Sequence, residues 1–218
     1  MSRQMKRSTL NRKIKSIIER IKKMQWRKCE LHGAGWYLYR MLLGRRKQSK
    51  DVIKFLDSDN LELLYATLDA WGMNSRGAQL EDFSTFKKNI LACKKYFKEI
   101  NEIYLNQSRI ENLYDSLENL LKILYENLRI MRSESKLISH SKLLHFLFPR
   151  MLMPIDGKHT LTWLYGNDGK SLNKYLEVIK FSFDVMQQNL RWTDYLNDDG
   201  NANIPKLIDN VIWKLAEE

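Results

Sequence analysis

Apolar residues recur at spacings of three and four along most of this 218-residue chain. This is the periodicity of helices with one buried face, whereas the strict alternation of a half-buried strand does not recur. Only three prolines and nine glycines interrupt the sequence, so the helical segments can be long. The sequence therefore predicts an all-α fold of nine or ten helices, without internal repeats.

Start and stop signals place individual helices within this pattern. Helix 109–131 has the sharpest start, because Ser108 and Glu111 form a capping box that satisfies free amide groups of a first turn. Pro205 suits the first turn of a helix and opens the last one. The other predicted helices cover 33–46, 51–57, 60–72, 80–105, 142–148, 157–165 and 172–186, with a loop at 73–79.

A chain of this length suits one globular domain or two small lobes. We expect a two-lobed, multi-helix protein in which helix 109–131 bridges the lobes. Residues 1–32 are then a basic N-terminal helix. Residues 33–108 together with 190–218 form the first lobe, and residues 109–189 form the second, which includes a hairpin-like segment at 133–165.

The positive charge of the protein is concentrated at its N-terminal end. The net charge is +11, yet residues 1–50 alone carry 16 Lys or Arg against Glu19 and Glu30. Within this region Ile14, Ile17, Ile18 and Ile21 lie at helical spacing, with basic residues on the opposite face. Such a surface commonly binds nucleic acid phosphates. A solvated face without a partner, an anionic membrane surface and a targeting peptide remain alternatives.

Cysteine usage and hydropathy indicate an intracellular, soluble protein. Cys29 and Cys93 lie far apart and match no paired metal-ligand spacing, so reduced thiols are expected. No stretch of 18 apolar residues is present that would span a membrane. Neither a metal site nor a bound cofactor is predicted, and the sequence does not define the oligomeric state.

The segment 141–160, SKLLHFLFPRMLMPIDGKHT, contains the clearest chemical pattern. An apolar helix ends near Pro149, and the residues around Pro154 favour an extended return. Asp156 then lies near the same end of the helix as Lys142. Asp156 is also placed to cap helix 157–165, so it is either a structural cap or a catalytic carboxylate. The step 137–142 either continues the helix or forms a hairpin.

The blocks SKLLHFLF and MPIDGKHTL resemble the lysine–helix–aspartate block of the helix-hairpin-helix DNA glycosylase superfamily, most closely its 8-oxoguanine glycosylases. This resemblance implies double-stranded DNA as the partner and base excision as the reaction, acting on a damaged purine. By position, Lys142 corresponds to the nucleophile that attacks the sugar C1′ and forms a Schiff base. Asp156 corresponds to the carboxylate that assists deprotonation and stabilises charge on the sugar.

Further residues are predicted to contact DNA. The family hairpin that grips a phosphate corresponds to 137–141 here, and polar loop and surface residues are further candidates for phosphate or base contacts. The predicted DNA-binding residues are Ser139, His140, Ser141, Lys158, His159, Asn74, Arg76, Arg45 and Arg46. Trp71, Trp163 and Trp192 are candidates to stack on an extruded base, although core packing is their alternative role.

Two other functions compete with the enzyme. One is a module that holds nucleic acid through the basic N-terminal segment without chemistry. The other is a helical domain that binds protein partners. Lys142 also has a simpler interpretation, as a surface or phosphate-binding side chain, because a Schiff-base amine needs its pKa lowered by burial or by a neighbouring cation.

Overall fold

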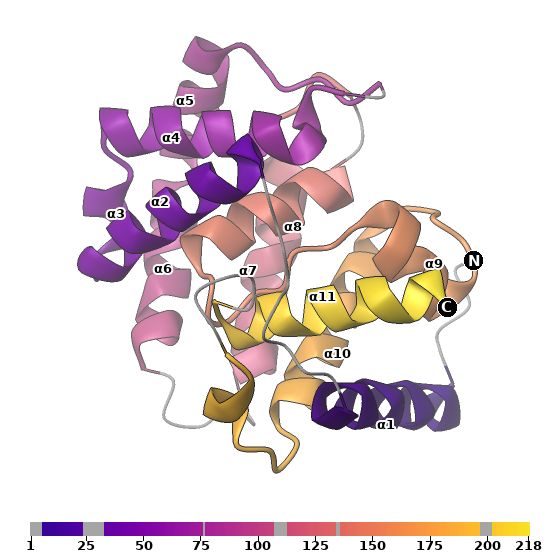
Figure 1. Ribbon diagram of the computed structural model, residues 1–218. Helices are drawn as coiled ribbons and strands as arrows, with labels where there is room; N and C mark the ends of the chain where they lie inside the picture. The colour runs from indigo at the N-terminus through magenta and orange to yellow at the C-terminus, as the bar shows by residue number, and fades with distance from the viewer. Residues whose placement is uncertain (1–5, 24–32, 76, 107–112, 134–135, 197–201) are drawn as a thin grey trace.

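The computed structural model describes residues 6–23, 33–75, 77–106, 113–133, 136–196 and 202–218 (Figure 1). These residues form an all-α fold, in which an isolated antiparallel bridge between Leu80 and Met131 is the β-type pairing. None of the described helices combines the length and apolarity needed to cross a membrane. The α-helices are α1 (Arg7–Lys23), α2 (Ala34–Gln48), α3 (Val52–Phe55), α4 (Ser58–Leu68), α5 (Phe83–Ala92), α6 (Lys94–Leu105), α7 (Leu113–Asn127), α8 (Lys136–Leu147), α9 (Thr162–Tyr165), α10 (Leu172–Met186) and α11 (Ile204–Glu217). Three further turns of helix are the π-helical η2 (Asp69–Met73) and η4 (Gly157–Leu161) and the 3₁₀-helical η5 (Trp192–Tyr195).

Side-chain caps fix where many of these helices begin. In each case a carboxylate, hydroxyl or amide oxygen accepts a hydrogen bond from a backbone amide two or three residues later, which satisfies a donor that the helix leaves free. The capping residues are Asp51, Asp57, Asp82, Asp156, Ser171 and Asn203. Gly72, at φ +83°, takes the left-handed conformation that follows α4 and ends this helical segment.

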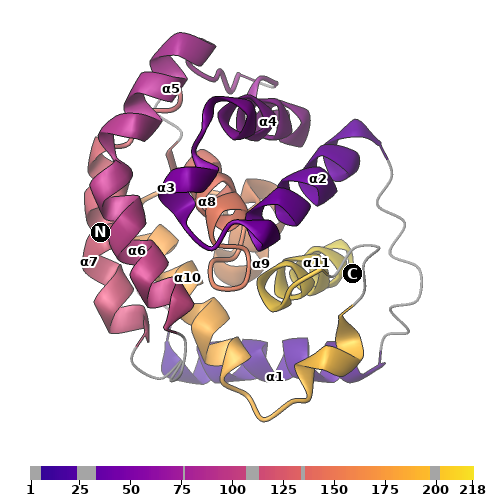
Figure 2. The same cartoon turned by 90° about the vertical axis from the view of Figure 1, so that its left-hand side faces the viewer.

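The helices form two groups around one continuous core. In Figures 1 and 2, α2 to α6 gather on one side and α1, α9, α10 and α11 on the other, with α8 between them. Helix α8 packs against α2 and α4 of the first group and against α10 of the second. The buried apolar side chains of both groups belong to a single cluster. The two expected lobes are therefore fused through a shared interior.

The C-terminal helix departs from the expected partition. Residues 190–218 were assigned to the lobe of 33–108, but α11 packs mainly on α1, α9, α10 and η4. Its buried stripe, which includes Leu207, Ile208, Val211 and Ile212, explains this position, because it faces the helices of the other group. Likewise, α1 is no separate unit, since Ile14, Ile17 and Ile21 are buried against α10 and α11.

Two long helices are shorter than predicted. The helix expected over 80–105 begins only at Phe83 and breaks at Cys93, a buried residue that ends α5 and precedes α6. This break bends the chain around the core and keeps Phe86 and Phe97 buried on both sides of it. The helix expected over 109–131 ends at Asn127 as α7. The capping box at Ser108 and Glu111 lies outside the described residues.

The segment 136–156 is a helix followed by an extended return. Helix α8 runs without interruption from Lys136, so the hairpin expected within 133–165 is absent from its described part. The hydroxyls of Ser139 and Ser141 donate to carbonyl oxygens three residues earlier, and this satisfies both groups inside a helix. Residues 149–151 form a turn, and the chain then returns along 152–156 without regular secondary structure and with Asp156 in an extended conformation. Pro205 lies in the first turn of α11, as predicted.

Candidate functional site

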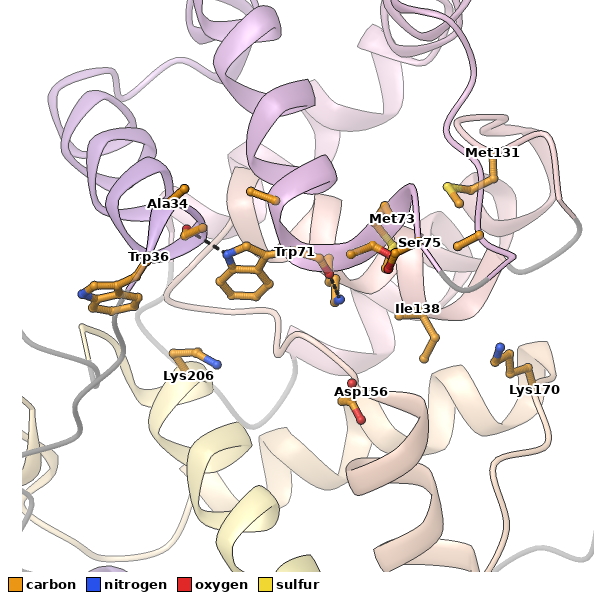
Figure 3. A pocket seen from close by; sticks show the side chains of 16 residues that line it. Ala34, Trp36, Trp71, Met73, Ser75, Met131, Ile138, Asp156, Lys170 and Lys206 are labelled. Carbon is orange, nitrogen blue, oxygen red and sulfur yellow. Dashed lines mark hydrogen bonds between the residues drawn. The ribbon is translucent and has the colours of Figure 1, made fainter.

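A pocket of about 870 Å³ lies between the two helix groups. One wall comes from the first residues of α2 and from η2, and α8 contributes Ile138 and Lys142. Figure 3 shows Trp36, Trp71 and Met73 along one side of the pocket, with Lys206, Asp156 and Lys170 across from them. A volume of this order is typical of pockets that hold a small organic group.

Lys142 is held in this pocket by the backbone of η2. Its Nζ donates a hydrogen bond of 2.7 Å to the carbonyl oxygen of Trp71 and lies 5.8 Å from the centre of the Trp71 ring. Burial lowers the pKa of Lys142 to about 8; Lys206 adds to this effect, whereas Asp156 and Asp209 oppose it. About a tenth of an amine with this pKa is uncharged at pH 7, and the uncharged form is the one that acts as a nucleophile.

Asp156 is both a cap and a pocket carboxylate. Its Oδ1 accepts hydrogen bonds from the backbone amide of His159 at 2.8 Å and from the His159 ring, whose Nδ1 lies 2.9 Å away. Burial acts to raise the pKa of Asp156, but these two hydrogen bonds and the charges of His159 and Lys142 outweigh burial and lower it. The carboxylate is therefore ionised at neutral pH and fixed in direction, and it lines the same pocket as Lys142.

Two hydrogen bonds hold the returning chain against α8 and so bring Lys142 and Asp156 together. The Ser141 hydroxyl accepts a hydrogen bond of 3.0 Å from the Ile155 amide, directly before Asp156. One turn further along α8, Nδ1 of His145 lies 2.7 Å from the Leu152 carbonyl. Since a carbonyl only accepts, this ring nitrogen carries the proton. Two buried polar residues of α8 therefore bring Asp156 to the same pocket as Lys142.

Trp71 forms a rigid wall that two ammonium groups share. Its Nε1 donates to the Gly35 carbonyl at 3.1 Å, and its ring packs on Tyr39 and Phe146. Lys206 of α11 lies 5.1 Å from the centre of the Trp71 ring and pairs with Asp209 at 2.6 Å. Gly35 permits this close packing, because a Cβ there would lie 3.1 Å from the Ala70 carbonyl oxygen.

Four of the residues predicted to bind DNA are buried in structural roles. Ser139, His140 and Ser141 lie inside α8, where no phosphate reaches their side chains, so the prediction of hairpin contacts is wrong for them. Arg46 is also wrong as a DNA contact. Its guanidinium donates to Leu147 O at 2.7 Å, to Asn101 Oδ1 at 2.6 Å and to the Ser49 carbonyl.

The other predicted contact residues are distributed around the molecule. Arg45, Asn74 and Lys158 are exposed, and His159 is half-buried against Trp213. Asn74 also has a structural role, since its Oδ1 accepts from the Leu80 amide at 2.8 Å. Arg76 lies outside the described residues. These four described residues do not line the pocket, and their contact with DNA at the protein surface remains a prediction.

Several pocket residues were not predicted from the sequence. Trp36, Lys170 and Lys206 line the pocket, whereas Trp163 and Trp192 do not. Trp163 instead lies under the ammonium of Lys13, 4.2 Å from its ring centre. The two glycines at the start of α2 gave one usable signal, because Gly35 marks a close approach to the backbone of Ala70 and Gly33 takes a φ of +102°. Among the described residues, no group of three or more His, Cys, Asp or Glu side chains is arranged to hold a metal ion.

Comparison of the chain with protein-family models, with curated proteins and with solved structures gave no match. The function has to be inferred from the chemistry of the pocket.

Proposed function

We propose that this protein is a DNA-binding, base-excision enzyme of the glycosylase/lyase type, with Lys142 as the nucleophile and Asp156 as the supporting carboxylate. The observation that carries the proposal is that both side chains line one pocket beside the ring of Trp71. An amine, a fixed carboxylate and an aromatic wall are the groups that attack on a sugar carbon requires when the attached base is extruded from a duplex.

The walls of the pocket suit a nucleotide, whose flat base can stack on aromatic rings and whose phosphate can contact lysines. Trp36 and Trp71 offer indole surfaces on which a base stacks, and base–aromatic stacking contributes about 1–3 kcal/mol. Lys142, Lys170 and Lys206 line the pocket together with the carboxylate of Asp156, and Lys206 also pairs with Asp209. These cationic side chains favour a ligand that carries phosphate.

The proposed reaction begins with the uncharged amine of Lys142. Its nitrogen forms a bond to C1′ while the bond from C1′ to the base nitrogen breaks, and the electron pair leaves with the base. Asp156 stabilises positive charge on the sugar during this exchange and accepts the proton that the attached nitrogen loses. That proton passes to the departing base. The bond between C1′ and O4′ then breaks, its electron pair stays on O4′, and the remaining proton of the attached nitrogen moves to O4′, which leaves an imine between C1′ and Lys142.

Borohydride trapping tests the proposal directly. The protein is incubated with duplexes that contain 8-oxoguanine or an abasic site, and borohydride is added to reduce any imine to a stable amine. We expect a covalent protein–DNA adduct whose attachment maps to Lys142 by mass spectrometry. Lys142→Gln removes the adduct.

The matched control is Lys180→Gln, which removes the same charge from an exposed position on α10, outside the pocket and outside the predicted DNA contacts. It should retain the adduct. Asp156→Asn should slow adduct formation about 10²–10⁴-fold, the usual contribution of a positioned acid–base group. If no lesion gives an adduct or base release, the enzyme proposal is wrong and a non-catalytic nucleic-acid-binding module takes its place.

A further inference from the structure

Helix α1 presents a basic surface that the pocket does not use. Its apolar face, Ile14, Ile17 and Ile21, is buried against α10 and α11. The opposite face exposes four basic side chains along the helix: Arg12, Lys15, Lys22 and Lys23. From Arg12 to Lys23 this row of basic side chains extends about 17 Å along α1, at 1.5 Å per residue.

Basic residues of α1 that do point inward serve to anchor the helix. Lys13 donates to the Trp163 carbonyl, and Arg20 pairs with Glu218 of the C-terminal helix. On the outer face, Glu19 is the acidic side chain of the described helix, and it lies 3.8 Å from Lys15 in an exposed pair. Helix α1 is therefore anchored in the fold, and its solvent-exposed face carries more positive than negative side chains.

The chemistry of the outer face distinguishes between possible partners. A membrane-surface helix inserts its apolar face into the lipid boundary, but in α1 that face is already buried in the protein core. Protein interfaces concentrate aromatic side chains at their centre and are depleted of lysine. The described outer face of α1 carries lysine, arginine, asparagine, serine and the single acid Glu19, and it has no aromatic residue. Phosphates of a nucleic acid backbone need only such a row of cations.

A groove lies along one side of α1. It has a volume of about 340 Å³ and is lined by Gln188, which follows α10, and by Asn11, Ile14, Lys15, Ile18, Glu19 and Lys22 of α1. Two of the four exposed cations thus lie at the edge of a depression. The amide group of Asn11 in the same groove provides a neutral donor for phosphate oxygens, whereas the Gln188 amide donates to the Asp184 carbonyl at 2.9 Å.

We infer that the outer face of α1 is a second, sequence-independent binding surface for the phosphate backbone of duplex nucleic acid, separate from the pocket. In both Figures 1 and 2, α11 lies between α1 and α2, the helix whose first residues line the pocket. The two surfaces can therefore be altered independently. The inference does not depend on any chemistry at Lys142.

The test replaces Arg12, Lys15, Lys22 and Lys23 together by Gln, which keeps a similar helix propensity. Affinity for an undamaged duplex is measured against salt concentration. Each phosphate contact contributes about −0.9 to the slope of log K against log salt, so we expect the slope to become shallower by about 2 to 4 and affinity at 0.1 M salt to fall at least about tenfold.

A control variant loses the same four charges elsewhere, through Gln at Lys47, Lys54, Lys95 and Lys98, which are exposed on α2, α3 and α6. Its slope should change by less than about 1. Circular dichroism and thermal unfolding verify that both variants fold. Equal slopes for the two variants would overturn the inference.

Two further measurements separate this surface from its rivals. Vesicles containing phosphatidylserine should not bind the protein in an α1-dependent manner; if they do while duplex affinity is unchanged, the partner is a membrane. Adduct formation at Lys142 with saturating abasic duplex should be retained in the α1 variant. Loss of the salt slope with no adduct in any variant would uphold the α1 surface and reject the proposed chemistry.

Discussion

The ammonium nitrogen of Lys142 lies 2.7 Å from the carbonyl oxygen of Trp71 and points into the pocket that Asp156 lines. One hydrogen bond to a neutral carbonyl replaces the water shell that an exposed lysine keeps. The cost of this exchange falls on the charged form, and it explains why burial lowers the pKa of Lys142 to about 8. The same hydrogen bond restricts the orientation of the Lys142 amine, in both its charged and its uncharged form.

The titration of Lys142 can be followed without any substrate. After reductive methylation with ¹³C-formaldehyde, the resonance of Lys142 is assigned by its loss in Lys142→Gln. We expect its midpoint near pH 8. Because Asp156 acts to raise the pKa of Lys142, Asp156→Asn should move the midpoint to lower pH. A midpoint near 10.5 in both proteins would contradict the burial of this ammonium group.

Lys142→Met should stabilise the fold at neutral pH. The pKa of Lys142 is lowered on folding, so the unfolded chain binds more protons between pH 8 and 10.5 and the wild-type protein gains stability as pH rises through that window. The variant avoids the burial of this charge. We expect a gain of about 1–3 kcal/mol in the free energy of unfolding at pH 7 that shrinks toward pH 10.

Urea unfolding at pH 7 and pH 10 measures this difference, and Lys158→Met, at an exposed position, is the matched control. A variant that is less stable than wild type at pH 7 would show that the hydrogen bond to Trp71 outweighs the cost of burial. An equal stability difference at both pH values would show that the pKa of Lys142 is not lowered on folding.

The sequence predicted the fold class and the pairing of Lys142 with Asp156 more successfully than the polar contacts. Helical period and caps are local, so α10 and α11 match their predicted ranges closely. The burial of Ser141 is not local, because it depends on the return of Ile155 against α8. The same applies to Arg46, whose carbonyl partners Leu147 and Ser49 come from two separate segments.

Arg46 and its neighbour Arg45 provide a direct test of that correction. Arg46 is buried and makes three hydrogen bonds that hold α2 to the end of α8 and to α6. Arg46→Met should cost about 2–4 kcal/mol of unfolding free energy, because the carbonyl and amide oxygens lose their donors. Arg45→Gln, on the exposed face, should change it by less than about 0.5 kcal/mol. Urea midpoints compare the two variants, and equal midpoints would contradict the buried role.

Acid should destabilise the protein through two buried histidines. Burial lowers the pKa of His145 to about 3 and of His140 to about 4, so both rings are uncharged in the fold. With His145 Nδ1 donating to Leu152, its Nε2 accepts from the Tyr39 hydroxyl at 2.6 Å, and that oxygen accepts from Asn203 at 3.1 Å. This chain of hydrogen bonds ties α2, α8 and the cap of α11 together, and it requires a neutral ring.

The unfolded chain binds protons at these histidines near pH 6.5, while the folded protein resists protonation until about pH 4 or below. Stability is therefore lost as pH falls from 6.5 toward 4, by up to about 1.4 kcal/mol per pH unit for each ring. His145→Gln should be less stable than wild type at pH 7, because its amide cannot reproduce both contacts, yet its stability should fall less steeply with acid. Urea unfolding from pH 7 to pH 4.5 measures both slopes. An unchanged slope in the variant would mean that His145 is not the buried, neutral link between Tyr39 and Leu152.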